Sequence, residues 1–149
     1  YFGALKMSSS QSVSVQIPIG LSAVGGVSAA DDYYACHGMN GEYKLEAAYF
    51  TPMVAVTAHA SNFVSLTIHQ GFEGTSTAIS SALTTDSDGG GAAMAIGTVR
   101  EFSMLTTDAA VAKQTFGATD VIFIDHDEAG SFTDAIEGIV TCRFVKVRE

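Results

Sequence analysis

Few residues in this sequence have a type and spacing that could do chemistry. The best metal candidate is the run DHDEAG at 125–130. Carboxylates at its first and third positions and glycine at its sixth match the start of a calcium loop, in which alternating oxygens converge on the ion. The match ends there, because Ala129 and Ile136 occupy the fifth and twelfth positions, where such a loop needs oxygen ligands. We therefore expect no metal ion, and Asp125 and Asp127 are only weak candidates for metal ligands.

Two histidines suggest another kind of site. His59 and His69 occupy the outward positions of two alternating runs and would be cross-strand neighbours in one register of a hairpin. Two imidazoles and a carboxylate suit a transition metal, whereas a histidine on the solvent face of a strand is the commoner arrangement. The sequence has no GxSxG motif and no phosphate-binding loop. We expect no catalytic residue, no cofactor and no enzymatic activity.

The two cysteines, Cys36 and Cys142, are far apart and have no CxxC partner. A zinc site is therefore not expected. Their spacing permits a disulfide but cannot establish one. We expect two buried free thiols in an intracellular product.

Low charge is the main compositional signal. Charged residues make up 15% of the 149-residue chain, against about 25% in an average soluble domain. A surface low in charge is expected where other subunits cover it, and equally on a monomer whose surface is rich in serine and threonine. The net charge of −9 argues against nucleic acid, which needs a basic face. No apolar run approaches 18 residues, so no membrane span is expected.

Period-two alternation dominates the chain and predicts strands. The strongest pattern covers residues 48–70 and predicts an antiparallel hairpin with one buried face, its two runs separated by a short polar break at 60–62. Residues 12–19 alternate most regularly, and Pro18 predicts that this strand lies at a sheet edge. Residues 42–50 predict a strand that buries Tyr43, Leu45, Ala47 and Tyr49.

The remaining elements are shorter or less regular. Asn40-Gly41 is a favoured two-residue hairpin turn, and residues 75–84 predict one or two strands. Residues 92–105 predict a long, mixed strand, with Gly97 as the point where it could break. Residues 108–114 form either a helical turn capped by Thr107 or Asp108 or a loop. Strands are expected at 121–125 and 136–148. The fold class is all-β: a single antiparallel β-sandwich or jelly-roll-like domain of about eight strands over residues 12–149.

Residues 1–11 are expected to form an extended N-terminal arm. Tyr1, Phe2, Leu5 and Met7 give it apolar content, which suits docking on a neighbour, although chain ends are commonly frayed. We take the following residues of the arm and the first strand as interface candidates: Tyr1, Phe2, Leu5, Met7, Val13, Val15 and Ile17.

Several segments together resemble the small β-sandwich decoration, or cement, proteins on the heads of tailed bacteriophages. The resemblance covers residues 31–148. It includes an aromatic-proline entry, two alternating runs, a glycine-rich acidic loop, a late apolar strand and the closing strand. These segments are YFTP at 49–52, VAVT at 54–57, VSLTI at 64–68, residues 86–91, GATDVI at 117–122 and GIVTCRF at 138–144.

The resemblance implies a non-enzymatic virion protein on the outer capsid surface, assembled in the host cytoplasm. It would clamp adjacent subunits of the major capsid protein, its partner, and would associate with itself, often as a homotrimer. Two alternatives stay open. One is a carbohydrate- or ligand-binding β-sandwich with Tyr33, Tyr34, Tyr43 and Tyr49 as stacking platforms. The other is a phage tail or fibre subunit.

Overall fold

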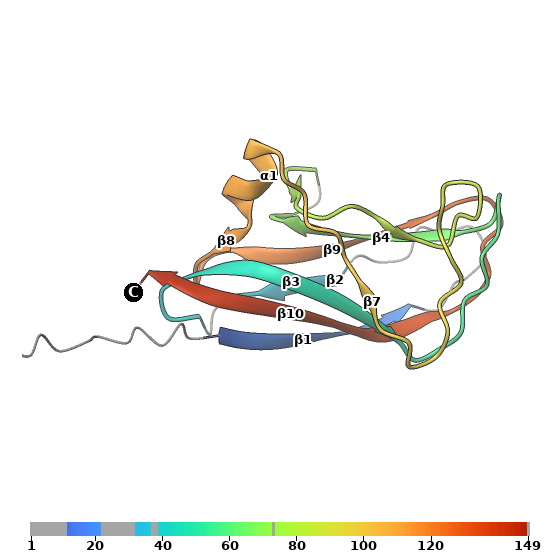
Figure 1. Ribbon diagram of the computed structural model, residues 1–149, viewed down its shortest axis with the longest axis horizontal. Coiled ribbons are helices and arrows are strands. Elements are labelled where there is room, and N and C mark those ends of the chain that lie inside the picture. Colours follow the sequence, from blue (N-terminus) through green and yellow to red (C-terminus); the bar gives the residue numbers. More distant parts are fainter. Residues whose placement is uncertain (1–11, 22–31, 37–38, 73, 149) are drawn as a thin grey trace, which may run out of the picture.

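Two antiparallel sheets form the computed structural model, which describes residues 12–21, 32–36, 39–72 and 74–148 (Figure 1). The first sheet has the order β1-β10-β3-β7, with β8 also paired to β3. Its strands are β1 (Ser12–Leu21), β3 (Glu42–Pro52), β7 (Arg100–Glu101), β8 (Thr115–Phe116) and β10 (Ile136–Arg148). The second sheet has the order β2-β9-β4-β5, with β6 also paired to β4. Its strands are β2 (Asp32–Ala35), β4 (Val64–Gln70), β5 (Thr77–Ala78), β6 (Leu83–Thr84) and β9 (Val121–Glu128).

The predicted all-β antiparallel sandwich is confirmed. The strand count of about eight is too low, because the described residues form ten strands, four of them only two residues long. The jelly-roll-like connection stays a prediction. The closing strand has the predicted bounds of 136–148, and β9 continues three residues beyond the predicted 121–125.

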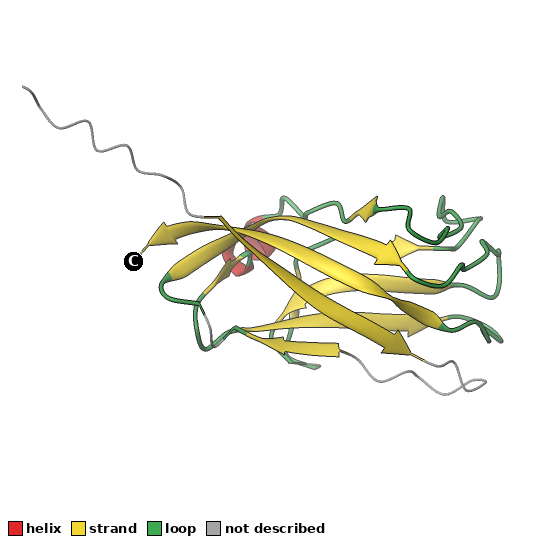
Figure 2. Ribbon diagram, turned by 90° about the horizontal axis from the view of Figure 1, so that it is seen from below, coloured by secondary structure: helices red, strands yellow, loops and turns green. Residues whose placement is uncertain are grey.

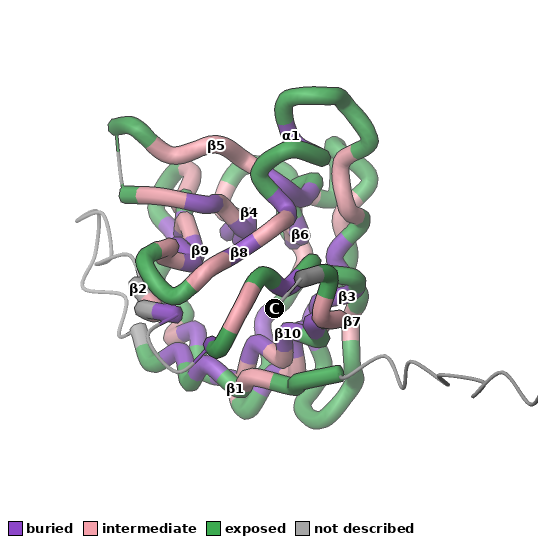
Figure 3. Tube along the Cα trace, turned by 90° about the vertical axis from the view of Figure 1, so that its left-hand side faces the viewer, coloured by how far each residue is buried: buried purple, intermediate pink, exposed green. Residues whose placement is uncertain are grey.

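The core lies between the two sheets, where the buried segments of the trace gather (Figure 3). Each long strand contributes alternate side chains, and each fully buried aliphatic or aromatic side chain contributes about 1.5–3 kcal/mol. The first sheet contributes Leu45, Phe50, Val140 and Phe144 among others, and the second contributes Val64, Leu66, Ile68, Ile122 and Ile124.

Strand β3 changes its buried face in the middle. Phe144 of β10 pairs with Leu45 and Arg143 pairs with Ala47, so Glu46 is an extra residue in the ladder, a β-bulge. Beyond the bulge Ala48 and Phe50 point into the core, whereas the simple alternation predicts Tyr49 on the buried side. Tyr49 is only half-buried, so that part of the prediction is wrong.

The hairpin predicted over 48–70 is wrong. Strands β3 and β4 lie in different sheets and face each other across the core. The first run of the predicted hairpin, residues 53–59, is not a strand: residues 53–63 cross between the sheets as a loop, with isolated bridges from Val56 to Met94 and from His59 to Asp86. Alternation therefore predicts β4 correctly, but it also assigns a strand to residues that form a loop between the sheets.

Two further expectations are also wrong. Asn40-Gly41 is not a hairpin turn, because β2 and β3 also belong to different sheets. Residues 92–105 contain only the two-residue β7 and the isolated bridges at Met94 and Met104. Gly97 interrupts this stretch in a turn with a φ of 72°. Cross-sheet connections therefore replace the expected local pairing.

The helical alternative for 108–114 is the one that forms, as α1 (Asp108–Lys113), the only helix in the described ranges (Figure 2). Thr107 is its N-cap, and its hydroxyl accepts a 3.4 Å hydrogen bond from the Ala110 N–H. No helix in these ranges is long and apolar enough to cross a membrane.

Candidate functional site

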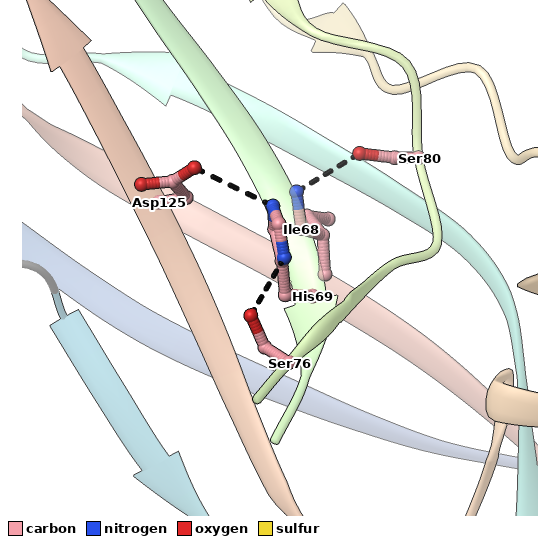
Figure 4. Close-up of polar contacts among 5 residues, drawn as sticks. All are labelled: Ile68, His69, Ser76, Ser80 and Asp125. Carbon is pink, nitrogen blue, oxygen red and sulfur yellow. Dashed lines mark hydrogen bonds and ion pairs between the residues drawn. The ribbon is translucent and has the colours of Figure 1, made fainter. Parts of the chain in front are cut away.

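A chain of polar side chains crosses the outer face of the second sheet (Figure 4). His69 on β4 lies 3.0 Å through Nδ1 from the Ser76 hydroxyl and 3.5 Å through Nε2 from Oδ2 of Asp125 on β9. The β4–β5 connection brings Ser76 back beside His69, and the pairing of Thr67 with Asp125 brings the carboxylate alongside. We call Ser76, His69 and Asp125 the polar relay.

The relay rests on a buried aromatic ring. Phe123 pairs with His69 across β9 and β4, and their ring centroids are 5.2 Å apart. Phe123 is 2% exposed but is not part of the core between the sheets. The histidine therefore covers a small apolar contact on the outer face, while its two nitrogens connect the 71–76 turn to β9.

The relay contains the three side-chain types of a serine hydrolase: a hydroxyl, an imidazole and a carboxylate. With its proton on Nε2, His69 would donate toward Asp125 and accept from the Ser76 hydroxyl at Nδ1. Acyl transfer also needs a cleft for the substrate and donors aimed at the oxyanion. The nearest cleft is about 150 Å³ and is lined by residues on either side of Ser76 but not by Ser76 or His69. We interpret the relay as a clamp that holds the 71–76 turn against β9.

The metal candidates do not converge in a loop. Asp125 and Asp127 lie on β9, in extended backbone rather than in the turn that a calcium site requires. Asp125 faces His69, whereas Asp127 is exposed opposite Ser65. Within the described ranges no group of three or more His, Cys, Asp or Glu side chains could hold a metal ion.

The two outward histidines are not cross-strand neighbours. His59 lies in the 53–63 loop, where its Nδ1 accepts hydrogen bonds of 3.0 Å from the N–H groups of Ser61 and Asn62. It therefore organises a turn, whereas His69 belongs to the relay. The alternative of a shared two-histidine site is wrong because the hairpin on which it depended does not form, and only His69 lies on a strand.

Both cysteines are buried free thiols, as expected. Burial raises the pKa of Cys36 to about 11, with the Asp120 carboxylate adding to the effect. Burial, together with the nearby Cys36, raises the pKa of Cys142 to about 12. Neither thiol is poised to react as a thiolate near neutral pH.

The interface candidates fall into three groups. Tyr1, Phe2, Leu5 and Met7 lie outside the described residues. Val13 is 38% exposed and Val15 is half-buried, so both side chains are accessible on β1. Ile17 is 4% exposed and belongs to the core, which removes it as a docking residue.

Three exposed apolar residues lie near the 96–99 turn and the end of β3, two segments that are placed away from α1 (Figure 1). The Gly97 N–H donates a 2.8 Å hydrogen bond to the carbonyl of Pro52, so the 96–99 turn folds against the end of β3. Around this contact Met53, Ile96 and Val99 are 57%, 65% and 58% exposed. We call these three residues the apolar corner.

Sequence patterns missed both features. The two glycines at 71 and 74 mark a turn that brings His69 and Ser76 together, but no pattern shows that β4 pairs with β9 and so adds Asp125. Ile96 and Val99 of the apolar corner lie inside the strand predicted over 92–105, and Met53 lies in the first run of the predicted hairpin. The apolar residues of a predicted strand are assigned to a buried face, so the pattern did not indicate an exposed surface. Gly97 was the one signal that the strand breaks there.

A second surface feature is an open groove of about 370 Å³ between α1 and the ends of β3 and β10. Its apolar lining includes Leu45, Met104, Val111 and Val145, and Lys44 and Glu46 are its charged members.

The chain was compared with known proteins by sequence and by structure. No model of a known protein family matches it, and neither a curated protein nor a solved structure gives a match.

Proposed function

We propose that this chain is a non-enzymatic virion protein that decorates and stabilises a bacteriophage capsid by binding across neighbouring subunits of the major capsid protein. It acts on the outer surface of the head as a rigid clamp. The sandwich positions the contact residues, and the arm at 1–11 adds an attachment point.

The apolar corner is the observation that carries this proposal. Scattered exposed hydrophobics are normal, but adjacent ones on a monomer's surface are typical of protein-binding sites. Met53 follows the end of β3, Ile96 and Val99 belong to the turn that the Gly97–Pro52 hydrogen bond holds there, and each exposes more than half of its surface. A contact there would bury apolar area, as the cores of protein interfaces do.

The carbohydrate-binding alternative receives less support from the tyrosines. Tyr43 is 6% exposed and Tyr34 packs against the core. Tyr49 is half-buried, and the side chain of Tyr33 lies outside the described residues. A stacking platform needs several exposed rings on one face, and these positions do not supply one.

The test is binding to heads assembled from the major capsid protein of the genome that encodes this chain, measured by cosedimentation. Ile96→Asp and Val99→Asp place a charge in the apolar corner and should abolish binding while leaving the circular dichroism spectrum and the melting temperature unchanged. Ala82→Asp adds the same charge at an exposed position near β6 and should bind normally. If all three variants bind like the unaltered chain, the apolar corner is not the docking surface.

A further inference from the structure

Strand β1 is an edge strand with unusual composition. It pairs with β10 on one side, and no strand in the described ranges pairs with its other side (Figure 1). Its ten residues, SVSVQIPIGL, carry no charge. Sheet edges in monomeric proteins are commonly protected by charged side chains, because an open row of N–H and C=O groups pairs readily with another strand. Pro18 is the one protective residue here, and it lies toward the far end of the strand.

The position of Pro18 indicates which backbone groups are free. Proline has no N–H and is tolerated in a sheet where that side of the residue faces outward. Since backbone direction alternates along a strand, Ser12, Ser14 and Gln16 then also point their N–H and C=O groups away from β10. No strand of the described residues pairs with this edge, so these three residues present an open ladder on the half of β1 that precedes Pro18.

We infer that the Ser12–Gln16 half of β1 pairs antiparallel with the same segment of a second copy, around a twofold axis at Ser14. In this register Ser14 faces Ser14 of the second copy, and Ser12 faces Gln16. Every outward N–H from residues 12, 14 and 16 finds a carbonyl, and Pro18 falls outside the ladder. Moving the axis to residue 15 or 16 would place Pro18 opposite Ser12 or Ser14 and lose a hydrogen bond.

The side chains support the same register. Val13 and Val15 point toward the core side of the first sheet, yet Val13 is 38% exposed and Val15 is half-buried. Pairing across the axis places Val13 of one copy opposite Val15 of the other, which extends the apolar face from one sheet to the next. Cross-strand pairs of β-branched residues are favourable in this arrangement.

Charge does not oppose the contact locally. The cation nearest to the axis in the ladder is Arg143, which pairs with Ser14 across β10. Its Nη2 lies 3.1 Å from Oε2 of Glu46, so two copies would bring together ion pairs rather than bare cations. The net charge of −9 on each copy predicts stronger association at higher salt concentration.

This contact goes beyond the proposed function and needs no capsid. An isologous contact builds dimers and even-numbered assemblies, and it cannot by itself build the homotrimer that the resemblance implies. The association is therefore tested on the purified 149-residue chain alone, so its failure would leave the capsid proposal untouched.

Cysteine crosslinking tests the register. Ser14→Cys lies on the axis, where the two Cα atoms would be about 5.5 Å apart, within the range for a disulfide. Gln16→Cys is the matched control, because its two copies would be about 14 Å apart along the ladder. Oxidised glutathione would form the new S–S bond from two thiols and be reduced to two molecules of glutathione. Cys36 and Cys142 are buried, so the unaltered chain should not crosslink.

The expected result is a covalent dimer from Ser14→Cys and little from Gln16→Cys. Light scattering should give the unaltered chain a mass about twice 15.5 kDa at high concentration. Ser14→Lys should weaken this association by about tenfold or more, because two ammonium groups would meet on the axis. Ser87→Lys, at an exposed loop position, should have no such effect. A monomer at every concentration, or equal crosslinking of the two cysteine variants, would overturn the inference.

Discussion

Replacing Phe50 with alanine tests the change of buried face in β3. Phe50 is 1% exposed and pairs with Val140 in the core. A fully buried phenylalanine replaced by alanine costs about 3–5 kcal/mol, through lost burial and the cavity left behind. The neighbouring Tyr49→Ala should cost only about 1 kcal/mol, the typical loss at a half-buried position. Simple alternation along 42–50 predicts the reverse order.

Urea unfolding followed by far-ultraviolet circular dichroism measures the difference, because the chain has no tryptophan to report by fluorescence. With an m-value of about 2 kcal/mol/M, Phe50→Ala should lower the unfolding midpoint by about 2 M and Tyr49→Ala by about 0.5 M. Unchanged m-values would show that both variants still unfold in the same cooperative transition. Equal losses, or a larger loss for Tyr49→Ala, would refute the bulge at Glu46 and the face assignment that depends on it.

Three further changes test separate features of the fold. Gly138→Ala should destabilise by about 1–3 kcal/mol or more, because a Cβ there would meet the Phe50 ring and the Thr51 carbonyl. Gly20→Ala, with nothing within 4 Å of the added Cβ, should leave the melting temperature nearly unchanged, and equal effects would contradict the packing. Burial raises the pKa of Glu128, so its contribution to stability is fully present below its ordinary pKa and is lost as pH rises through the raised value. Glu128→Gln should therefore raise the urea midpoint at pH 7 and leave it unchanged at pH 3.5, and a pH-independent effect would argue against this cause. Thr107→Ala should cost about 1 kcal/mol through loss of the N-cap, whereas Thr106→Ala should be neutral, and equal hydrogen exchange of α1 in the two variants would contradict the capping role.

Alternation predicted the individual strands well. The bounds of β10, the edge position of β1 and the buried face of β4 all follow from period-two patterns. These features are local, because a strand with one apolar face must bury that face whichever strand lies beside it.

Pairing between distant segments was not accessible from the pattern. The 48–70 stretch has the alternation of a hairpin, yet its first run forms the loop at 53–63 and only its second run forms a strand, β4. The bulge at Glu46 also reverses the parity of β3, and because residues 47–50 are all apolar, the pattern does not show where the parity changes. Predicting the relay would likewise require the register of β4 against β9, which places Asp125 beside His69.

We propose that this protein binds the outside of a phage head. The most direct test of this proposal is cosedimentation of the unaltered chain with heads assembled from the major capsid protein of its own genome. The proposal predicts saturable binding with a fixed ratio of this chain to capsid subunits, and added stability of the heads toward heat. No binding at concentrations of tens of micromolar would contradict it.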